Sequence, residues 1–327
     1  MTTTFAEPKV GHARWQTLRG VGSALTMART DHDTWDPATS VGTTATLVAT
    51  ARALATRAGL INDPFAETLV HAVGLDFFTQ VASGELAISD LGDNNGFGLL
   101  TDLFAVRTRF FDNFLTDAGR AGIRQAVILA SGLDTRPYRL WWPSGTTVYE
   151  IDQPGVIEFK TQALRALDAT PTANRRAVGI DLRRDWPEAL RRVGFDATVP
   201  TVWVAEGLFI GFLLPDTHDR LLDAVTALSA PGSRAAADYL PDRSQPLASQ
   251  EHLLADRWRP YGFDGDMTEL TYPDERHDVA NSLAASGWKT VVTDLVDLFT
   301  VTGLPGLRHQ DLSGAPVAGR YVSATLA

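Results

Sequence analysis

The sequence predicts an α/β fold in which a largely parallel sheet is covered by helices on both faces. From residue 126 onward, short apolar runs alternate with segments whose apolar residues recur at helical spacing. Such alternation is typical of strand–helix–strand units, which place helices on the two faces of a parallel sheet. Five strands of this series are expected at 126–130, 147–151, 177–180, 201–205 and 234–239.

Helices are expected between these strands, near 155–167, 185–193 and 215–229. The helix near 185–193 begins at Asp185 and has Glu188 three residues later, a spacing that favours an N-terminal capping box. The tail should add two more strands, near 289–294 and 320–325.

Residues 1–118 contain no convincing strand, and we expect them to form an N-terminal helical cap. Segments 43–59 and 103–119 have helical spacing, with a glycine placed to end each one. Residues 119–327 should then form the core domain. Its fifth strand is followed by a helical lid insertion at about 240–286, and cap and lid should both cover the carboxyl edge of the sheet.

Composition and charge exclude several classes of protein. The chain of 327 residues has no cysteine, so disulfides, thiolate catalysis and cysteine-ligated metal are excluded. Its seven histidines show no metal-ligand spacing, and no metal site is expected. A net charge of −10 without a basic patch argues against a nucleic-acid partner. We see no signal peptide and no apolar run near ~18 residues, so a cytoplasmic protein without membrane contact is expected.

The loop after the first expected strand, in "VILASGLDTRPYRL", is the candidate ligand loop. In a doubly wound sheet, ligands bind at the carboxyl ends of the strands near the switch point. A dinucleotide site would need G-x-G-x-x-G, so that the pyrophosphate can approach the backbone. Only Gly132 is present here, and Arg136-Pro137 stand where the third glycine would lie. A tight strand-to-helix turn without a ligand is the alternative.

An acid at the end of the next strand indicates which ligand this loop could bind. Asp152 lies twenty positions after Gly132, a spacing that suits an acid holding ribose hydroxyls. The two features together predict a cofactor with a nucleoside but no pyrophosphate, and S-adenosyl-L-methionine fits. Asp134 could then hold the positive side of the cofactor or brace the turn.

Two further acids follow later strands. Asp181 and Leu182 could bind an adenine, the carboxylate accepting from the exocyclic amine and the leucine packing on the ring; alternatively, Asp181 caps the next turn. Glu206 ends a strand among apolar neighbours, where a carboxylate is costly unless it is paired. A cationic ligand could pair it, and so could an arginine of the chain.

Four linked motifs, "GLDTRPYRL", "EIDQPGVIEFK", "DLRRDWPEAL" and "AEGLF", resemble the S-adenosylmethionine-dependent methyltransferases related to leucine carboxyl methyltransferase, in particular an actinobacterial branch. The resemblance runs from about Thr44 to the end of the chain. It implies a Rossmann-like class I methyltransferase sheet with an N-terminal helical cap and an inserted helical lid.

The resemblance also implies roles for individual residues. Asp152 is similar to the family's ribose acid, and Asp181 with Leu182 to its adenine contacts. Glu206 resembles the acid on the cofactor's amino-acid side. The cofactor-binding set expected in this chain is Arg52, Arg107, Ala130, Ser131, Gly132, Asp134, Asp152, Asp181, Leu182 and Glu206, with the two arginines holding the cofactor's carboxylate.

This chain departs from the family's pattern at two points. The family's ligand loop often has glycine at both ends of its three-residue turn, whereas the first position here is Ala130. After Glu206 the common "LLPYLP" pattern becomes "LFIGFLLP", which is longer and has no tyrosine. The first change could shift the backbone contact with the cofactor, and the second could reshape the pocket.

The function expected from the sequence is O-methyl transfer to a carboxyl or hydroxyl oxygen of a fairly apolar small molecule. Cap and lid are rich in aromatic residues, a feature that suits an apolar pocket. A protein carboxyl terminus is another possible acceptor. A nicotinamide-dependent oxidoreductase and a cofactor-binding protein without turnover are the rival classes.

The sequence identifies no firm general base, and it does not define the oligomeric state. His252 and His277 flank the expected lid and are weak catalytic candidates. His218 lies near the start of an expected helix, where we expect it to be solvated.

Overall fold

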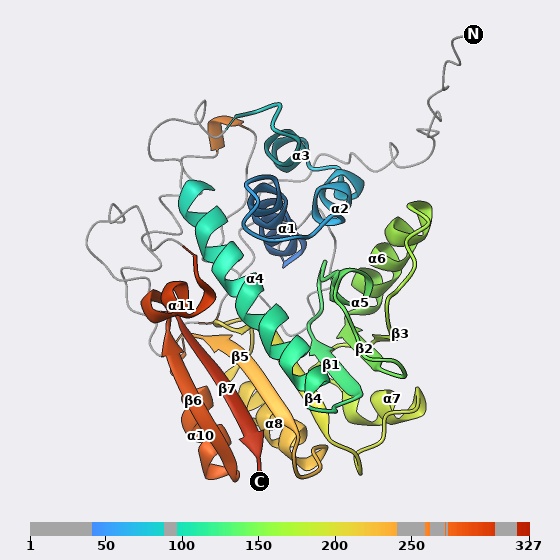
Figure 1. Cartoon of the computed structure of the whole chain (residues 1–327), viewed down its shortest axis with the longest axis vertical. Coiled ribbons are helices and arrows are strands. Elements are labelled where there is room, and N and C mark those ends of the chain that lie inside the picture. Colours follow the sequence, from blue (N-terminus) through green and yellow to red (C-terminus); the bar gives the residue numbers. More distant parts are fainter. Residues whose placement is uncertain (1–40, 88–96, 241–258, 262–271, 273, 305–318) are drawn as a thin grey trace.

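A seven-stranded sheet forms the centre of the computed structural model (Figure 1). The structure describes residues 41–87, 97–240, 259–261, 272, 274–304 and 319–327. The strands lie in the order β3-β2-β1-β4-β5-β7-β6, and β7 is antiparallel to both of its neighbours. Their bounds are β1 Gln125–Leu129, β2 Thr147–Asp152, β3 Asn174–Gly179, β4 Thr201–Phe209, β5 Arg234–Tyr239, β6 Trp288–Asp294 and β7 Arg320–Leu326. The expected α/β fold and all seven expected strands are therefore confirmed.

The strand order reverses at β1, because β2 and β3 lie on one side of it and β4 and β5 on the other. β1 ends at Leu129, whose partners in register are Ile151 on β2 and Ala205 on β4. Asp152 and Glu206 directly follow those partners, so both acids lie beside the loop that follows β1. This is the switch point at which an open α/β sheet binds its ligands.

The helices agree with the expected alternation. Their bounds are α1 Val41–Arg57, α2 Ala66–Val73, α3 Asp76–Ser83, α4 Phe97–Arg120, α5 Arg136–Arg139, α6 Pro154–Ala166, α7 Trp186–Arg192, α8 Pro215–Ala227, α10 Val279–Ala285 and α11 Leu295–Thr302, with a short 3-10 turn at Arg259–Tyr261. The Asp185 side chain accepts the Glu188 backbone N–H at 3.1 Å and caps α7 as expected. α11 was not expected. None of the described helices is long and apolar enough to cross a membrane.

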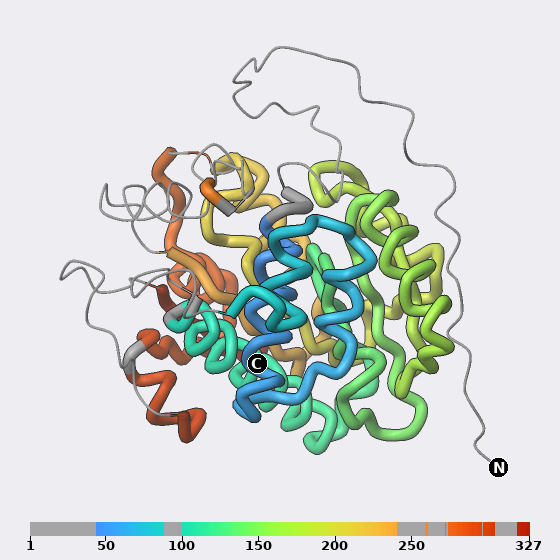
Figure 2. Tube along the Cα trace, turned by 90° about the horizontal axis from the view of Figure 1, so that it is seen from above, coloured from blue at the N-terminus to red at the C-terminus, as the bar shows by residue number. Residues whose placement is uncertain are grey.

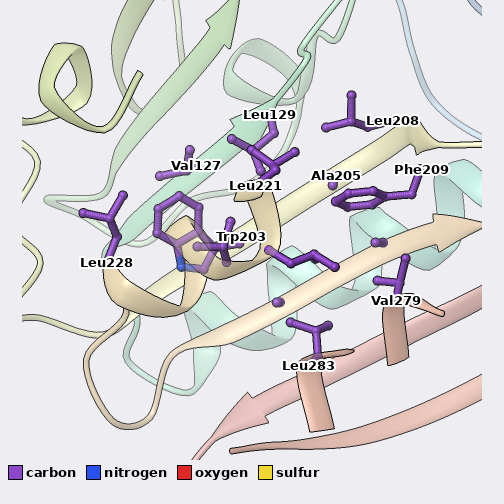
Figure 3. Packing of buried hydrophobic residues seen from close by; sticks show 14 of the residues in the cluster. Val127, Leu129, Trp203, Ala205, Leu208, Phe209, Leu221, Leu228, Val279 and Leu283 are labelled. Atoms are coloured by element: carbon purple, nitrogen blue, oxygen red, sulfur yellow. The ribbon is translucent and has the colours of Figure 1, made fainter. Parts of the chain in front are cut away.

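One face of the sheet packs against α7, α8 and α10. The period of two along β1 directs Val127 and Leu129 to this face, where they meet Trp203 of β4 (Figure 3). α10 contributes Val279 and Leu283 to the same core. The end of the segment expected as a lid, 240–286, therefore includes a helix that is packed on the sheet.

The opposite face of the sheet packs against α4 and α11. Ala126 and Ile128, which alternate with the residues of the first face, contact Phe111 and Leu115 of α4. α4 thus covers a face of the sheet as well as its edge. Helices α1, α2 and α3 form a separate apolar cluster over the carboxyl ends of the strands, where the blue segments lie in Figure 2.

The expectation that His218 is solvated is wrong. His218 is 1% exposed, lies edge-on to Phe209 with ring centroids 4.8 Å apart, and has no hydrogen-bond partner on either ring nitrogen. It faces inward because α8 also buries Leu221, Leu222 and Val225, at the spacing of one helical face. Burial lowers the pKa of His218 to about 4.

We expect His218 to make the protein less stable in mild acid. The unfolded chain, in which its pKa is ~6.5, binds the proton more tightly than the folded chain. The contribution of neutral His218 to the free energy of unfolding is fully present above pH ~6.5 and is lost as the pH falls toward the folded pKa of about 4. Between pH 7 and pH 5 this loss is about 2 kcal/mol of unfolding free energy. Urea unfolding at both pH values should show it, and His218→Leu should remove that part of the slope. The exposed control His71→Leu should keep the full loss of unfolding free energy between pH 7 and pH 5. If His218→Leu also keeps it, buried His218 is not its source.

Candidate cofactor pocket

A pocket opens at the switch point, between the carboxyl ends of β1, β2 and β4 and the overlying helix α1. All ten residues expected to bind the cofactor line it: Arg52, Arg107, Ala130, Ser131, Gly132, Asp134, Asp152, Asp181, Leu182 and Glu206. They come from α1, α4, the ends of three strands and the segment that follows β3. The fold thus gathers residues that are up to about half the chain apart into one site.

The loop after β1 is held in an unusual backbone conformation. Ala130 has a φ of 50° and Gly132 a φ of 42°, both in the left-handed region. The backbone N–H of Ser131 donates to the carbonyl of Ile151 at 3.0 Å, which ties the loop to β2. Glycine at 132 is favoured because it lacks the Cβ that makes this region costly for other residues.

Replacing Ala130 by glycine is expected to stabilise the protein by about 0.5–1 kcal/mol. The left-handed region costs a residue with a Cβ about 1–2 kcal/mol, and the greater freedom of glycine in the unfolded chain offsets part of that gain. Denaturant unfolding measures the change. The control Ala284→Gly, on an exposed position of α10, should instead destabilise by about 1 kcal/mol. Equal destabilisation by both variants would show that Ala130 is not strained.

Asp152 is the acid beside this loop, and both of its oxygens are in use. Oδ2 accepts the backbone N–H of Gly132 at 2.6 Å, and Oδ1 accepts the backbone N–H of Gln153 at 2.7 Å. Burial raises the pKa of Asp152, although these two bonds oppose the rise. Each oxygen has a second lone pair, and the residue lines the pocket, so the carboxylate can still accept hydroxyl donors from a ligand.

Asp181 both caps a turn and lines the pocket. Its carboxylate accepts the backbone N–H of Arg183 at 2.8 Å and pairs with the guanidinium of the same residue at 2.6 Å. Burial opposes ionisation of Asp181, but the hydrogen bonds from Arg183 outweigh it and lower the pKa of the carboxyl. The capping alternative is therefore confirmed, and Leu182 and Arg183 enter the pocket wall beside it.

Ionic side chains on the α4 side of the pocket join into one continuous network, called here the ionic chain. Its ion-paired members lie between 2.5 and 3.8 Å apart, and Asp134 branches off at Arg136, which also pairs with Glu206. Its members, in order, are Arg52, Asp63, Arg139, Asp112, Arg136, Asp134, Glu206, Arg107 and Asp238. Four of them, Arg52, Asp134, Glu206 and Arg107, line the pocket.

Arg136 is the centre of the ionic chain, a role that was not expected from the sequence. Its guanidinium is fully buried and pairs with Asp112 at 2.7 Å, Asp134 at 2.5 Å and Glu206 at 2.6 Å. Burial opposes ionisation of Asp134, but Arg136 outweighs it and brings the pKa of Asp134 to about 2. Asp134 therefore braces the turn, one of the two roles expected for it. The available signal was the pair Arg136-Pro137 in the region where a dinucleotide loop has its third glycine.

Glu206 and Arg107 form the opposite end of the ionic chain. Glu206 pairs with arginines of the chain, which was one of the two alternatives expected for it. Burial opposes ionisation of this carboxyl, but the arginines outweigh burial and lower its pKa. β4 does not end at 205 as expected but continues to Phe209 through an irregularity. Gly207, in this irregularity, has a φ of 72°, and a Cβ there would lie 2.5 Å from Nη2 of Arg107. Only glycine lets that guanidinium approach so closely.

Several buried polar atoms of the pocket lining have no hydrogen-bond partner. They include Nε of Arg52, Nε of Arg107, Oε1 of Glu206 and the hydroxyl of Thr44. Arg107 and Glu206 are 3.1 Å apart through two of these atoms, but the contact is not aligned as a hydrogen bond. Buried polar atoms are rarely left unsatisfied. The lining therefore fits a ligand with both positive and negative groups, as the amino-acid end of S-adenosylmethionine has.

The rest of the lining is mostly apolar and comes largely from α1, the end of β4 and the segment after β4. Val48, Leu208, Phe212, Leu213 and Leu214 form most of it. The hydroxyl-bearing residues near them are Thr44, Thr217 and Tyr272. Tyr272 was not expected here from the sequence, in which the segment after Glu206 lacks a tyrosine.

Tyr272 reaches the pocket from beyond β5. Its backbone N–H donates to the carbonyl of Gly211 at 2.9 Å. Arg276 donates to the carbonyls of Leu213 at 2.9 Å and Tyr272 at 2.8 Å, which joins the two segments. A tyrosine from a distant part of the chain thus stands beside the altered segment.

The two histidines considered as catalytic candidates differ in outcome. His277 does not line the pocket: its side chain is 78% exposed and lies 2.8 Å from Asp219, so the structure does not bring it together with the other site residues. His252 lies outside the described residues. Among the residues that the structure describes, no cluster of three or more histidine, aspartate and glutamate side chains is suited to a metal ion.

The sheet order and the pocket at its switch point define a Rossmann-like methyltransferase fold. The sequence profile described as leucine carboxyl methyltransferase matches residues 45–226. The chain belongs to this leucine carboxyl methyltransferase family.

Relatives named S-adenosyl-L-methionine-dependent methyltransferases cover nearly the whole chain. One from Mycobacterium bovis is 53% identical over 317 residues, which are 94% of this chain and 90% of the relative. One from Mycobacterium ulcerans is 56% identical over 91% of this chain and 98% of the relative. Among solved structures, a methyltransferase from Thermobifida fusca is 18% identical over 86% of this chain and 94% of its own, with a TM-score of 0.46.

Proposed function

We propose that this S-adenosylmethionine-dependent methyltransferase transfers the methyl group to a carboxyl or hydroxyl oxygen of a fairly apolar small molecule. The observation that carries the proposal is the composition of the pocket wall. On one side are the ionic chain, Asp152 and Asp181, which suit the cofactor; on the other are apolar side chains with a few hydroxyls. Small-molecule sites are mostly apolar with sparse polar groups.

We assign the cofactor's parts to the residues that fit them. Asp152 would accept the ribose hydroxyls, and Asp181 with Leu182 would hold the adenine. Arg52 and Arg107 would bind the carboxylate, and Glu206 the ammonium, through the polar atoms that lack partners. The bound cofactor supplies an electrophilic methyl group on a positively charged sulfur.

The chain's own contribution to the reaction is to position the acceptor and exclude water. The described lining residues include no histidine and no lysine. Asp134 and Glu206 line the pocket but are weak bases, because arginines lower the pKa of each carboxyl. An oxygen that is already anionic, such as a carboxylate or an acidic phenolate, needs no base. Alignment and desolvation of two reactants can supply much of a rate enhancement.

A screen of acceptors tests the proposal. The full chain is incubated with S-adenosylmethionine and with carboxylic acids, phenols, amines or peptides, and mass spectrometry detects the methylated product and the released S-adenosylhomocysteine. We expect turnover of apolar carboxylic acids or phenols, and none with Asp152→Ala. A preference for amines would contradict O-methylation, and methylation of peptides alone would favour a protein carboxyl terminus. No turnover of any acceptor by cofactor-bound protein would favour a binding protein without catalysis.

A further inference from the structure

The ionic chain contains one more carboxylate than it has arginines. It has four arginines and five acids, and eight ion pairs of 3.8 Å or less join them. Most of these side chains are nearly inaccessible to water; Asp112 is the most exposed, at 18%. Water and salt screen such charges weakly, so an excess charge acts over a longer distance than it would on the surface.

The other charged groups beside the pocket do not cancel this excess. Lys160 and Arg175 pair with Glu150 in a second buried cluster, which carries one positive charge. Asp152, whose partners are backbone N–H groups, adds one negative charge. Asp181 and Arg183 cancel each other. The groups named here sum to one negative charge, and so do the charged side chains that line the pocket, which are three arginines and four carboxylates.

The cofactor and its product differ by one charge at a single atom. At neutral pH, S-adenosylmethionine carries a sulfonium, an ammonium and a carboxylate, and its net charge is positive. In the transfer, the bond from carbon to sulfur breaks with its electron pair left on sulfur, and the acceptor oxygen forms the new bond to carbon. The product, S-adenosylhomocysteine, keeps the ammonium and the carboxylate but has an uncharged sulfur, so it is neutral overall.

We propose that the uncompensated carboxylate of the ionic chain makes the pocket select the charged cofactor over the neutral product. The excess negative charge attracts the sulfonium and has no counterpart in the product. Methyl transfer therefore removes part of the attraction that held the cofactor, which favours exchange of product for a new cofactor. The inference concerns the cofactor alone and stands whatever the acceptor is.

Asp238 is the residue through which this inference can be tested. It ends the ionic chain, lies 3.2 Å from Nε of Arg107, and accepts the backbone N–H of Gly207 at 2.6 Å. It is not among the residues that line the pocket, although Gly207 and Arg107 are. Asp238→Asn removes the charge, keeps an oxygen for the Gly207 N–H, and removes no direct contact of a ligand with residue 238.

The measurement is the ratio of two dissociation constants, for S-adenosylhomocysteine and for S-adenosylmethionine, by titration calorimetry. A change in how Arg107 binds the common carboxylate alters both constants equally and leaves their ratio unchanged. We expect Asp238→Asn to lower the ratio about tenfold, as a buried charge at a distance of several ångströms would. Sinefungin, which carries an amine where the cofactor has its sulfonium, should follow S-adenosylmethionine.

A matched control separates the ionic chain from the protein's overall charge. Asp117→Asn removes an exposed carboxylate on α4 and should leave the ratio as in the wild type. If Asp238→Asn does not fold, Asp112→Asn removes another carboxylate of the ionic chain that does not line the pocket, and should lower the ratio in the same direction. An unchanged ratio in the folded variant overturns the proposal, as does an equal shift in the Asp117→Asn control. Neither result depends on the acceptor screen.

Discussion

Replacing Arg136 by methionine is expected to lower the free energy of unfolding by about 3–5 kcal/mol. The arginine has no exposed side-chain surface and pairs with Asp112, Asp134 and Glu206. Methionine fills similar space but leaves Asp134 and Glu206 without their main cation and Asp112 with Arg139 alone. A buried charge that has lost its partner is strongly destabilising. Guanidinium unfolding followed by tryptophan fluorescence measures the change.

Two comparisons show whether the loss comes from these ion pairs. Arg120→Met removes an exposed pair with Asp117 and should cost well under ~1 kcal/mol. The pKa of Asp134 is lowered in the folded protein to about 2, so the stability it contributes is present above its unfolded pKa of ~3.8 and is lost as the pH falls toward 2. The difference in unfolding free energy between the wild type and Arg136→Met should therefore shrink below pH ~4. A difference that is small at neutral pH, or that grows in acid, would contradict this account.

Replacing Asp152 by alanine is expected to weaken S-adenosylmethionine binding more than a hundredfold, or about 3 kcal/mol. The substitution removes the acceptor proposed for the ribose hydroxyls, which would then be buried without partners. It also removes the bonds by which Asp152 holds the backbone N–H groups of Gly132 and Gln153, so the ligand loop loses one of its ties to β2. Both losses affect the same ligand.

Calorimetric titration with S-adenosylmethionine measures the effect on affinity, and thermal unfolding confirms that the variant is folded. Asp185→Ala is the matched control, because it removes a carboxylate that caps a helix and does not line the pocket. It should lower stability by about 1 kcal/mol and leave the dissociation constant unchanged. A folded Asp152→Ala protein with wild-type affinity would show that this acid does not hold the cofactor.

The sequence predicted the sheet and much of the pocket for one physical reason. The carboxyl ends of parallel strands meet at one edge, so an acid that follows an apolar run is placed near the other such acids. Asp152 and Glu206 could be identified in this way, since each directly follows an apolar run. The family resemblance added Arg52 and Arg107. These residues lie on helices, and the meeting of strand ends at one sheet edge does not fix where a helix places its side chains.

The ionic chain was not predictable in the same way. Its members come from α1, α4, α5 and the strand ends, and the contact between Arg136 and Glu206 joins residues 70 positions apart. Asp238 had no signal beyond its place near the end of a strand. His218, in contrast, could have been predicted to be buried, since it shares one helical face with Leu221 and Val225.

Binding of S-adenosylmethionine compared with binding of NAD tests the central claim most directly. The pocket has one glycine where a dinucleotide loop needs three, Arg136-Pro137 in the region of the last, and an acid excess suited to a cation. Titration calorimetry of the full chain should show saturable binding of one S-adenosylmethionine per chain and no measurable binding of NAD. Tighter binding of NAD than of S-adenosylmethionine would contradict the account.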